Sequence, residues 1–146
     1  MLVAIDPGVS GGIAWKDNDG IVQAAPMPDT QGDIVDHLRF LKSQGNVAAV
    51  YLERTGGYMS GNSGPSACKF ARGCGFLEGA VMALAMPLIE VAPHNWMKAI
   101  GSFPSDKRER KNAIKNLMQA RYPHLTITLS TSDALGLLTY ALEKKV

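Results

Sequence analysis

Residues 2–25 read LVAIDPGVSGGIAWKDNDGIVQAA, and this stretch decides the fold. Its apolar residues fall into short runs, which are separated by the turn-forming pairs Pro7-Gly8 and Asp19-Gly20. Asp-Gly between two apolar runs is typical of a β-hairpin. We therefore expect the chain to begin with three antiparallel strands, at Leu2–Asp6, Gly12–Trp15 and Ile21–Ala25.

The rest of the sequence alternates between helical and strand patterns. Residues 30–42 place apolar side chains at helical spacing, whereas 47–52 form a nearly continuous apolar run that fits a strand buried on both faces. Further elements are expected as a strand at 87–91 and helices at 66–85, from an N-cap at Ser105 to about Arg121, and at 131–144. This order predicts an α/β fold. Its mixed five-stranded sheet has three antiparallel strands and then two parallel strands, with helices on both faces.

Composition and charge limit the class of protein. The 146 residues are 46% hydrophobic and 19% charged, which is typical of one globular domain spanning 1–146. Cys68 and Cys74 lie six residues apart on one expected helix, so they should face different sides and remain reduced. No signal segment or membrane span is visible, so we expect a soluble, cytoplasmic protein with no membrane partner. Residues 94–124 hold seven Lys or Arg and two acidic residues, which favours an anionic partner.

Three carboxylates stand at positions that could meet. Asp6 ends the first strand, Glu53 follows the apolar run at 47–52, and Asp133 lies in the first turn of the last expected helix. Polar side chains at the ends of central strands gather at one mouth of an α/β sheet. Asp6 could instead be only a turn residue, and Asp133 could only stabilise a helix N-terminus. Glu53 is harder to explain structurally, because a carboxylate after an apolar strand risks burial without a partner.

If these carboxylates meet, they favour a divalent cation. Grouped carboxylates repel one another unless a cation lies among them or a pKa rises. Oxygen ligands with open positions suit Mg²⁺ or Mn²⁺. Two such ions about 4 Å apart can activate a water on one side of a phosphodiester and stabilise the leaving oxygen on the other. Phosphodiester cleavage is therefore the chemistry that this set of residues predicts.

Several motifs, in order along nearly the whole chain, resemble the RuvC-type Holliday-junction resolvases. The opening of that family is similar to Ile5-Asp6-Pro7-Gly8 with Gly12-Ile13-Ala14, and its second carboxylate strand to Tyr51-Leu52-Glu53. Its central helix and next strand are similar to Ala71-Arg72-Gly73, Gly79-Ala80 and Pro87-Leu88-Ile89-Glu90. Its closing acidic helix is similar to Ser132-Asp133-Ala134-Leu135 with Leu138. The resemblance implies a ribonuclease-H-like fold.

The resemblance also implies an activity and a site. It implies a homodimeric, metal-dependent endonuclease that makes paired symmetric nicks in four-way DNA junctions during recombination and repair. The catalytic and metal-binding residues would be Asp6, Glu53 and Asp133, holding Mg²⁺ or Mn²⁺ in a two-metal site. The family usually has a fourth catalytic group, Asp or His, one helical turn before its last Asp, where this chain has Ser130. A hydroxyl is a poor metal ligand and a poor base. Either three carboxylates and the substrate phosphate hold the ions, or the catalytic group has shifted.

Candidate DNA-binding residues lie on three segments. In the helix beginning near Ser105, one basic stripe should face solvent while Ala113, Ile114, Leu117 and Met118 face inward. Lys69 and Arg72 could bind the DNA backbone next to the scissile phosphate. In the glycine-rich loop 54–65, Tyr58 or Met59 could unstack bases; the resemblance implies an aromatic in this loop that stacks at the open centre of the junction. The basic residues could instead be ordinary solvated charges, and Tyr58 could fold back onto the surface. The basic candidates after residue 94 are Lys98, Lys107, Arg108, Lys111 and Lys115.

Dimerisation and two other functions complete the expectations. The central helix, with Gly73, Gly75 and Gly79, could supply a close contact between two copies. YqgF-type relatives share the Asp, Glu and Asp arrangement but are associated with RNA processing, so a preference for structured RNA would favour that alternative. A catalytically silent junction-binding protein would bind junctions tightly and cleave them in neither Mg²⁺ nor Mn²⁺.

Overall fold

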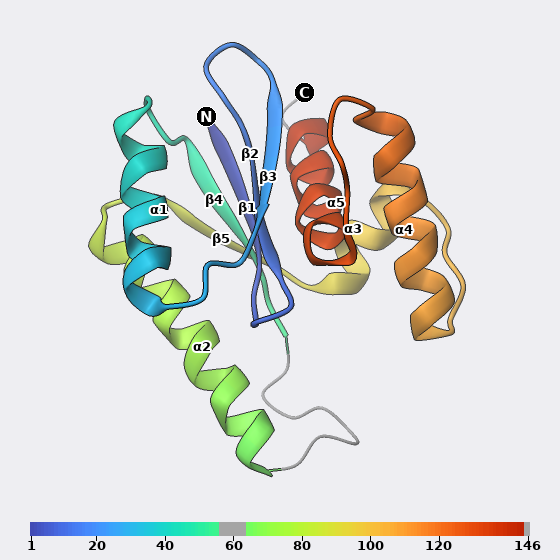
Figure 1. Ribbon diagram of the computed structural model, residues 1–146, viewed down its shortest axis with the longest axis horizontal. Coiled ribbons are helices and arrows are strands. Elements are labelled where there is room, and N and C mark those ends of the chain that lie inside the picture. Colours follow the sequence, from blue (N-terminus) through green and yellow to red (C-terminus); the bar gives the residue numbers. More distant parts are fainter. Residues whose placement is uncertain (56–63, 145–146) are drawn as a thin grey trace.

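Figure 1 shows the computed structural model of the protein, which describes residues 1–55 and 64–144. The strands in these residues are β1 (Leu2–Asp6), β2 (Gly12–Lys16), β3 (Val22–Pro26), β4 (Ala49–Glu53) and β5 (Leu88–Val91). The helices are α1 (Gln31–Ser43), α2 (Gly64–Ala83), α3 (Pro93–Ile100), α4 (Lys107–Arg121) and α5 (Leu129–Lys144). Every strand and helix expected from the sequence is present, with ends shifted by a few residues.

The strands form one mixed sheet in the order β3-β2-β1-β4-β5. The first three strands pair antiparallel, whereas β4 pairs parallel with both β1 and β5. The β2–β3 turn is held by the Asp17 carboxylate, which accepts hydrogen bonds from the backbone N–H groups of Asp19 and Ile21. Gly20 adopts φ of +81° in this turn, a conformation that favours glycine. The expected sheet, three antiparallel strands followed by two parallel strands, is confirmed.

Helices cover both faces of the sheet. Figure 1 shows α1 and α2 on one side and α3, α4 and α5 on the other. Because successive strand residues point to opposite faces, Val3 and Ile5 of β1 pack with Leu38 of α1, while Leu2 and Ala4 belong to the core that contains α5. This alternation places β1 between two apolar layers. Its end at Asp6 is therefore close to elements from both faces.

Helix α5 is the most enclosed helix of the described chain. Its residues are buried continuously from Thr131 to Ala141, because the sheet, α3 and α4 surround it. Its first turn rests on the end of β2. A Cβ added to Gly12 would lie only 2.5 Å from the backbone oxygen of Ser130. This close approach places the start of α5 beside Asp6, because Gly12 is the strand partner of Asp6.

The structure corrects two expected helix starts. Helix α5 begins at Leu129, so Asp133 lies in its second turn rather than its first. Charge at the helix terminus therefore does not account for this aspartate. The N-cap of α4 is Asp106 rather than Ser105, and its side chain accepts a hydrogen bond from the backbone N–H of Glu109. Local sequence permits either cap, because Ser and Asp both accept such a bond.

Helix α2 departs most from its expected burial pattern. Only Leu77 and Val81 of the expected apolar stripe are buried. The cause is the direction of the helix, whose first half extends past the end of the sheet (Figure 1). Cys68 and Cys74 on this helix are free, as predicted. Within residues 1–55 and 64–144, no helix combines the length and the apolar character required to span a lipid bilayer.

Candidate active site

Asp6, Glu53 and Asp133 come together at one edge of the sheet. Ile5 of β1 pairs with Leu52 of β4, so the residues that follow, Asp6 and Glu53, end two neighbouring parallel strands. Helix α5 packs on β1 and brings Asp133 to the same edge, near enough for its charge to act on both other carboxyls. The sheet topology thus brings Asp6 and Glu53 together, and the packing of α5 on the sheet adds Asp133.

The Asp6 carboxyl is the most perturbed group of the cluster. Burial, followed by the charges of Glu53 and Asp133, raises the pKa of Asp6 from 3.8 to about 8, and Lys111 opposes that shift. A charge in a poorly solvated site is costly, and two like charges nearby add to the cost. In the absence of a further cation, Asp6 therefore carries its proton at neutral pH.

Glu53 is buried with a specific partner. Only 8% of its surface is exposed, and burial is the main cause that raises its pKa from 4.5 to about 7. The indole N–H of Trp96 donates a hydrogen bond to Glu53 Oε2 across 2.7 Å and opposes the rise, while the charge of Asp133 adds to it. Both Asp6 and Glu53 therefore have pKa values well above the ordinary range of a carboxyl.

Asp133 has one oxygen with a partner and one without. Its Oδ2 lies 3.4 Å from the Lys111 ammonium, and its Oδ1 is buried with no hydrogen-bond partner among the described residues. The expectation that Lys111 faces solvent is therefore wrong, since this half-buried side chain of α4 reaches into the acidic site. The helix period had placed Lys111 on an outer stripe, but the packing of α4 on α5 brings its ammonium to Asp133, while Lys107 and Arg108 of the same stripe stay exposed.

The chemistry of the three carboxylates fits a divalent cation. The unpartnered Asp133 Oδ1 and the raised pKa values of Asp6 and Glu53 mark a place where positive charge is insufficient. All candidate ligands are carboxylate oxygens, which hard cations prefer. In the part of the chain that the structure describes, however, no three acidic, histidine or cysteine side chains already stand in a metal-binding arrangement. A divalent cation would therefore require the three carboxylates to move closer together. Before such a cation binds, the Lys111 ammonium next to Asp133 supplies positive charge.

Ser130 lies on the border of this cluster. It is half-buried in the first turn of α5, one turn before Asp133. Its backbone oxygen faces Gly12, the strand partner of Asp6. The position is thus adjacent to the acidic site. That Ser130 replaces the fourth catalytic group of the family stays a prediction.

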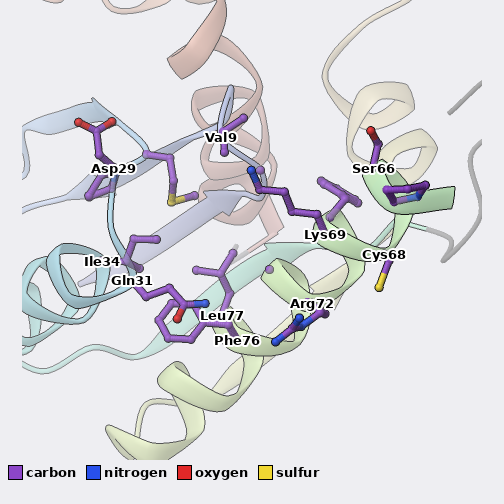
Figure 2. Close-up of a pocket in the computed structure, with 16 residues that line it drawn as sticks. Val9, Asp29, Gln31, Ile34, Ser66, Cys68, Lys69, Arg72, Phe76 and Leu77 are labelled. Atoms are coloured by element: carbon purple, nitrogen blue, oxygen red, sulfur yellow. The ribbon is translucent and has the colours of Figure 1, made fainter. Parts of the chain in front are cut away.

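The basic candidates flank the site on both faces of the sheet. On α4, Lys107 and Arg108 are exposed and Lys115 is half-buried, and Lys98 is exposed on α3. On the other face, Lys69 and Arg72 of α2 are exposed and line a groove of about 780 Å³. Figure 2 shows Lys69 extending across this groove toward Val9, which lies in the loop that follows Asp6. Tyr58 and Met59, the residues predicted to unstack bases, lie outside the described residues.

Sequence reasoning missed the polar role of Trp96. The Trp96 side chain is fully buried in α3. The hydrogen bond to Glu53 was not foreseen, because the two residues are 43 positions apart in sequence. The available signal was chemical: a buried carboxylate and a buried indole each require a partner.

Comparisons with solved structures identify the fold. No protein-family model matches the chain, and no curated protein matches it either. The chain is similar to Thermus thermophilus RuvC in complex with Holliday junction substrate, with a TM-score of 0.64 and 14% identity over 99% of this chain and 94% of that one. It is also similar to the fowlpox virus resolvase in its complex with Holliday junction DNA, with a TM-score of 0.54 and 10% identity over 99% of both chains. A second structure of the fowlpox virus resolvase gives a TM-score of 0.56 and 16% identity over 98% of both chains. The fold is therefore the ribonuclease-H-like fold of RuvC-type resolvases, as the sequence motifs predicted.

Proposed function

We propose that this protein is a metal-dependent endonuclease that resolves four-way DNA junctions by paired symmetric nicks. The observation that carries the proposal is the gathering of Asp6, Glu53 and Asp133 at one edge of the sheet, with two strongly raised pKa values. Such perturbed groups are concentrated at functional sites. Solved structures that share the fold contain Holliday junction DNA, which supports a branched DNA substrate for this chain.

Asp6, Glu53 and Asp133 would hold Mg²⁺ or Mn²⁺ in this mechanism. When bound, such ions activate a water for attack on the phosphodiester and stabilise the leaving oxygen. Asp133 offers the unpartnered Oδ1 as a ligand. Asp6 must release its proton first, so its raised pKa delays formation of the site in acid. Ser130 contributes at most a hydrogen bond to substrate or water, because its hydroxyl is a weak ligand.

In the proposed reaction, Lys111 contacts Asp133 in the free protein and a DNA phosphate in the complex. Without substrate, its ammonium lies 3.4 Å from Asp133 Oδ2 and compensates the acidic cluster. With DNA bound, a phosphate can share that ammonium, which positions the scissile group next to the carboxylates. Lys107 and Lys115 lie one helical turn on either side of Lys111. The basic stripe therefore runs past the acidic site, where a DNA backbone would contact it.

The function is tested by incubating the full chain with a synthetic four-way DNA junction in Mg²⁺ and in Mn²⁺. Linear duplex of the same sequence and structured RNA serve as competing substrates. Paired nicks confined to the four-way junction support the proposal. Tight junction binding without cleavage would favour the silent junction-binding protein. Preferential cleavage of structured RNA would favour a YqgF-type activity.

Loss of two exposed cations on α4 should weaken junction binding without affecting the fold. For the double variant Lys107→Ala/Arg108→Ala we expect the dependence of binding on salt to fall by about one unit of slope per lost phosphate contact. The matched control is Lys16→Ala, because Lys16 pairs with Leu2 at the opposite end of the sheet from Asp6. Fluorescence anisotropy at several salt concentrations provides the measurement. An unchanged salt dependence in the double variant would remove this stripe from the DNA path.

We also propose that two copies associate through α2. Most of this helix is uncovered, and a Cβ added at Gly73, Gly75 or Gly79 would meet nothing within 4 Å. Gly75 and Gly79 are four residues apart, so they lie on the same side of the helix. A two-fold dimer would present two acidic sites to the two strands that a resolvase must nick.

A double variant on α2 tests the proposed dimer and should leave the fold of each protomer intact. Gly75→Gln/Gly79→Gln adds side chains into open space and replaces poor helix formers, so each protomer should remain folded or gain stability. We expect the variant to shift from dimer to monomer in sedimentation velocity. Gly32→Gln is the control, since it adds the same side chain to the exposed start of α1. A wild-type monomer at all concentrations would contradict the proposed assembly.

A further inference from the structure

Trp96 connects the acidic site to the helix that carries Asp133. Its indole N–H donates a hydrogen bond to Glu53 Oε2 across 2.7 Å in the protein interior. The Trp96 side chain has no exposed surface, and the N–H is its single donor. The one hydrogen-bond donor of the buried Trp96 side chain is therefore used on Glu53, a candidate metal ligand.

Gly136 provides the space in which the indole lies. A Cβ added at Gly136 would be 2.5 Å from Cζ3 of Trp96, so the ring rests against the backbone of α5. Gly136 follows Asp133 by three residues and lies one turn along the same side of the helix. One rigid side chain thus touches Glu53 of β4 and the segment of α5 next to Asp133.

A neutral donor is suited to a carboxylate that must later bind a cation. A Lys or Arg partner would hold Glu53 but would also neutralise it and compete with the metal. The indole N–H holds one oxygen and leaves the negative charge and the second oxygen available. Metal-binding carboxylates are commonly oriented by such hydrogen bonds, and losing the outer partner weakens metal binding or activity.

We propose that Trp96 is a positioning residue that fixes the orientation of Glu53 relative to Asp133 before a divalent cation binds. Gly136 is its counterpart on α5, because a larger residue there would displace the indole. The inference rests on the proposed metal site and assigns Trp96 no contact with DNA. It predicts that the indole N–H matters for metal affinity beyond the volume that the ring fills.

The test compares two single tryptophan variants of the full chain. Trp96→Phe keeps an aromatic ring in the core and removes the donor, whereas Trp15→Phe changes the tryptophan of β2 that contacts His37. Mn²⁺ binding to the free protein is measured by electron paramagnetic resonance, and single-turnover cleavage of a four-way junction is measured separately. We expect Trp96→Phe to lower Mn²⁺ affinity by about tenfold to a hundredfold. Its maximal cleavage rate should fall while its junction affinity stays at the wild-type value, and Trp15→Phe should preserve all three quantities.

A second variant separates the donor from the shape of the ring. Trp96→3-benzothienylalanine, introduced at this single site, replaces the N–H by sulfur and retains the bicyclic form. If it loses Mn²⁺ affinity as Trp96→Phe does, while thermal unfolding shows a folded core, the hydrogen bond is responsible. Wild-type Mn²⁺ affinity in this variant would overturn the inference, because ring volume alone would then suffice.

The outcomes also separate this inference from the proposed function. If the wild-type protein binds Mn²⁺ and cleaves junctions while both position-96 variants match it, only the role of Trp96 fails. If it binds Mn²⁺ and both position-96 variants weaken that binding, the inference holds even where no junction is cut. A wild-type chain that binds no Mn²⁺ and cuts no junction would overturn both.

Discussion

Replacing Asp6 by Asn is expected to abolish cleavage of four-way junctions while leaving the protein folded. Asp6 ends β1 beside Glu53 and Asp133, so its loss removes one of three ligands and one negative charge from the proposed metal site. Stabilisation of transferring oxygens by a metal ion is worth several kcal/mol. A loss of about 4 kcal/mol corresponds to roughly a thousandfold in rate. Single-turnover cleavage of a labelled junction measures this effect.

The matched control for Asp6→Asn is Asp36→Asn. Asp36 is an exposed carboxylate of α1 that pairs with Arg39 in the next turn, and such surface pairs contribute little. We expect this control to cleave at the wild-type rate. Junction binding by Asp6→Asn should persist, because the candidate phosphate contacts come from other residues. Full cleavage by Asp6→Asn would place the chemistry elsewhere.

The metal-free protein is expected to become less stable as pH rises from weakly acidic to weakly basic. The folded-state pKa values are about 8 for Asp6 and about 7 for Glu53, both well above their ordinary values. Between the ordinary and raised pKa values, the folded state holds protons that the unfolded state has lost. Stability is therefore greatest at low pH within this window and declines as pH rises through both raised values. The decline should be on the order of 5 kcal/mol between about pH 5.5 and pH 8.5, with the larger part from Asp6.

Denaturant unfolding in the presence of a chelator measures this pH dependence. Burial lowers the pKa of His37, which produces a slope of opposite sign near its ordinary value of 6.5. Subtracting the unfolding free energy of Asp6→Asn from that of wild type at each pH removes the His37 contribution, because both proteins contain His37. We expect Asp6→Asn to be the more stable protein above about pH 7, because it lacks the buried acid that must ionise. Parallel profiles for the two proteins would contradict a raised pKa at Asp6.

Divalent cations should reverse the decline. Mg²⁺ or Mn²⁺ binds ionised carboxylates, so its stabilising effect grows as pH rises through the pKa values of Glu53 and Asp6. The gain in wild-type unfolding free energy on adding Mn²⁺ should therefore be larger at about pH 8.5 than at about pH 5.5. Asp6→Asn should gain less, because one ligand is missing. An equal gain in both proteins would place the bound cation away from Asp6.

Local sequence was sufficient for the order and type of the elements. The turn at Asp19-Gly20 and the alternation in β1 follow from backbone conformation and strand geometry, which depend on nearby residues. The positions of Asp6 and Glu53 were predictable for the same reason, because both stand where an apolar strand ends. That they adjoin depends on the strand order, which the sequence did not predict: β1 and β4 are parallel neighbours, and Ile5 pairs with Leu52.

Tertiary packing decided what each site residue contacts. Helical spacing placed Lys111 on a basic stripe, but only the packing of α4 on α5 turned its ammonium toward Asp133. The bond between Trp96 and Glu53, and the glycine at 136 that makes room for the indole, join three elements distant in sequence. The sequence by itself determined which residues end strands and which faces of elements are apolar, because those properties are local. Burial and the charges of distant residues determined the pKa values and partners of the carboxylates, because both depend on the assembled fold.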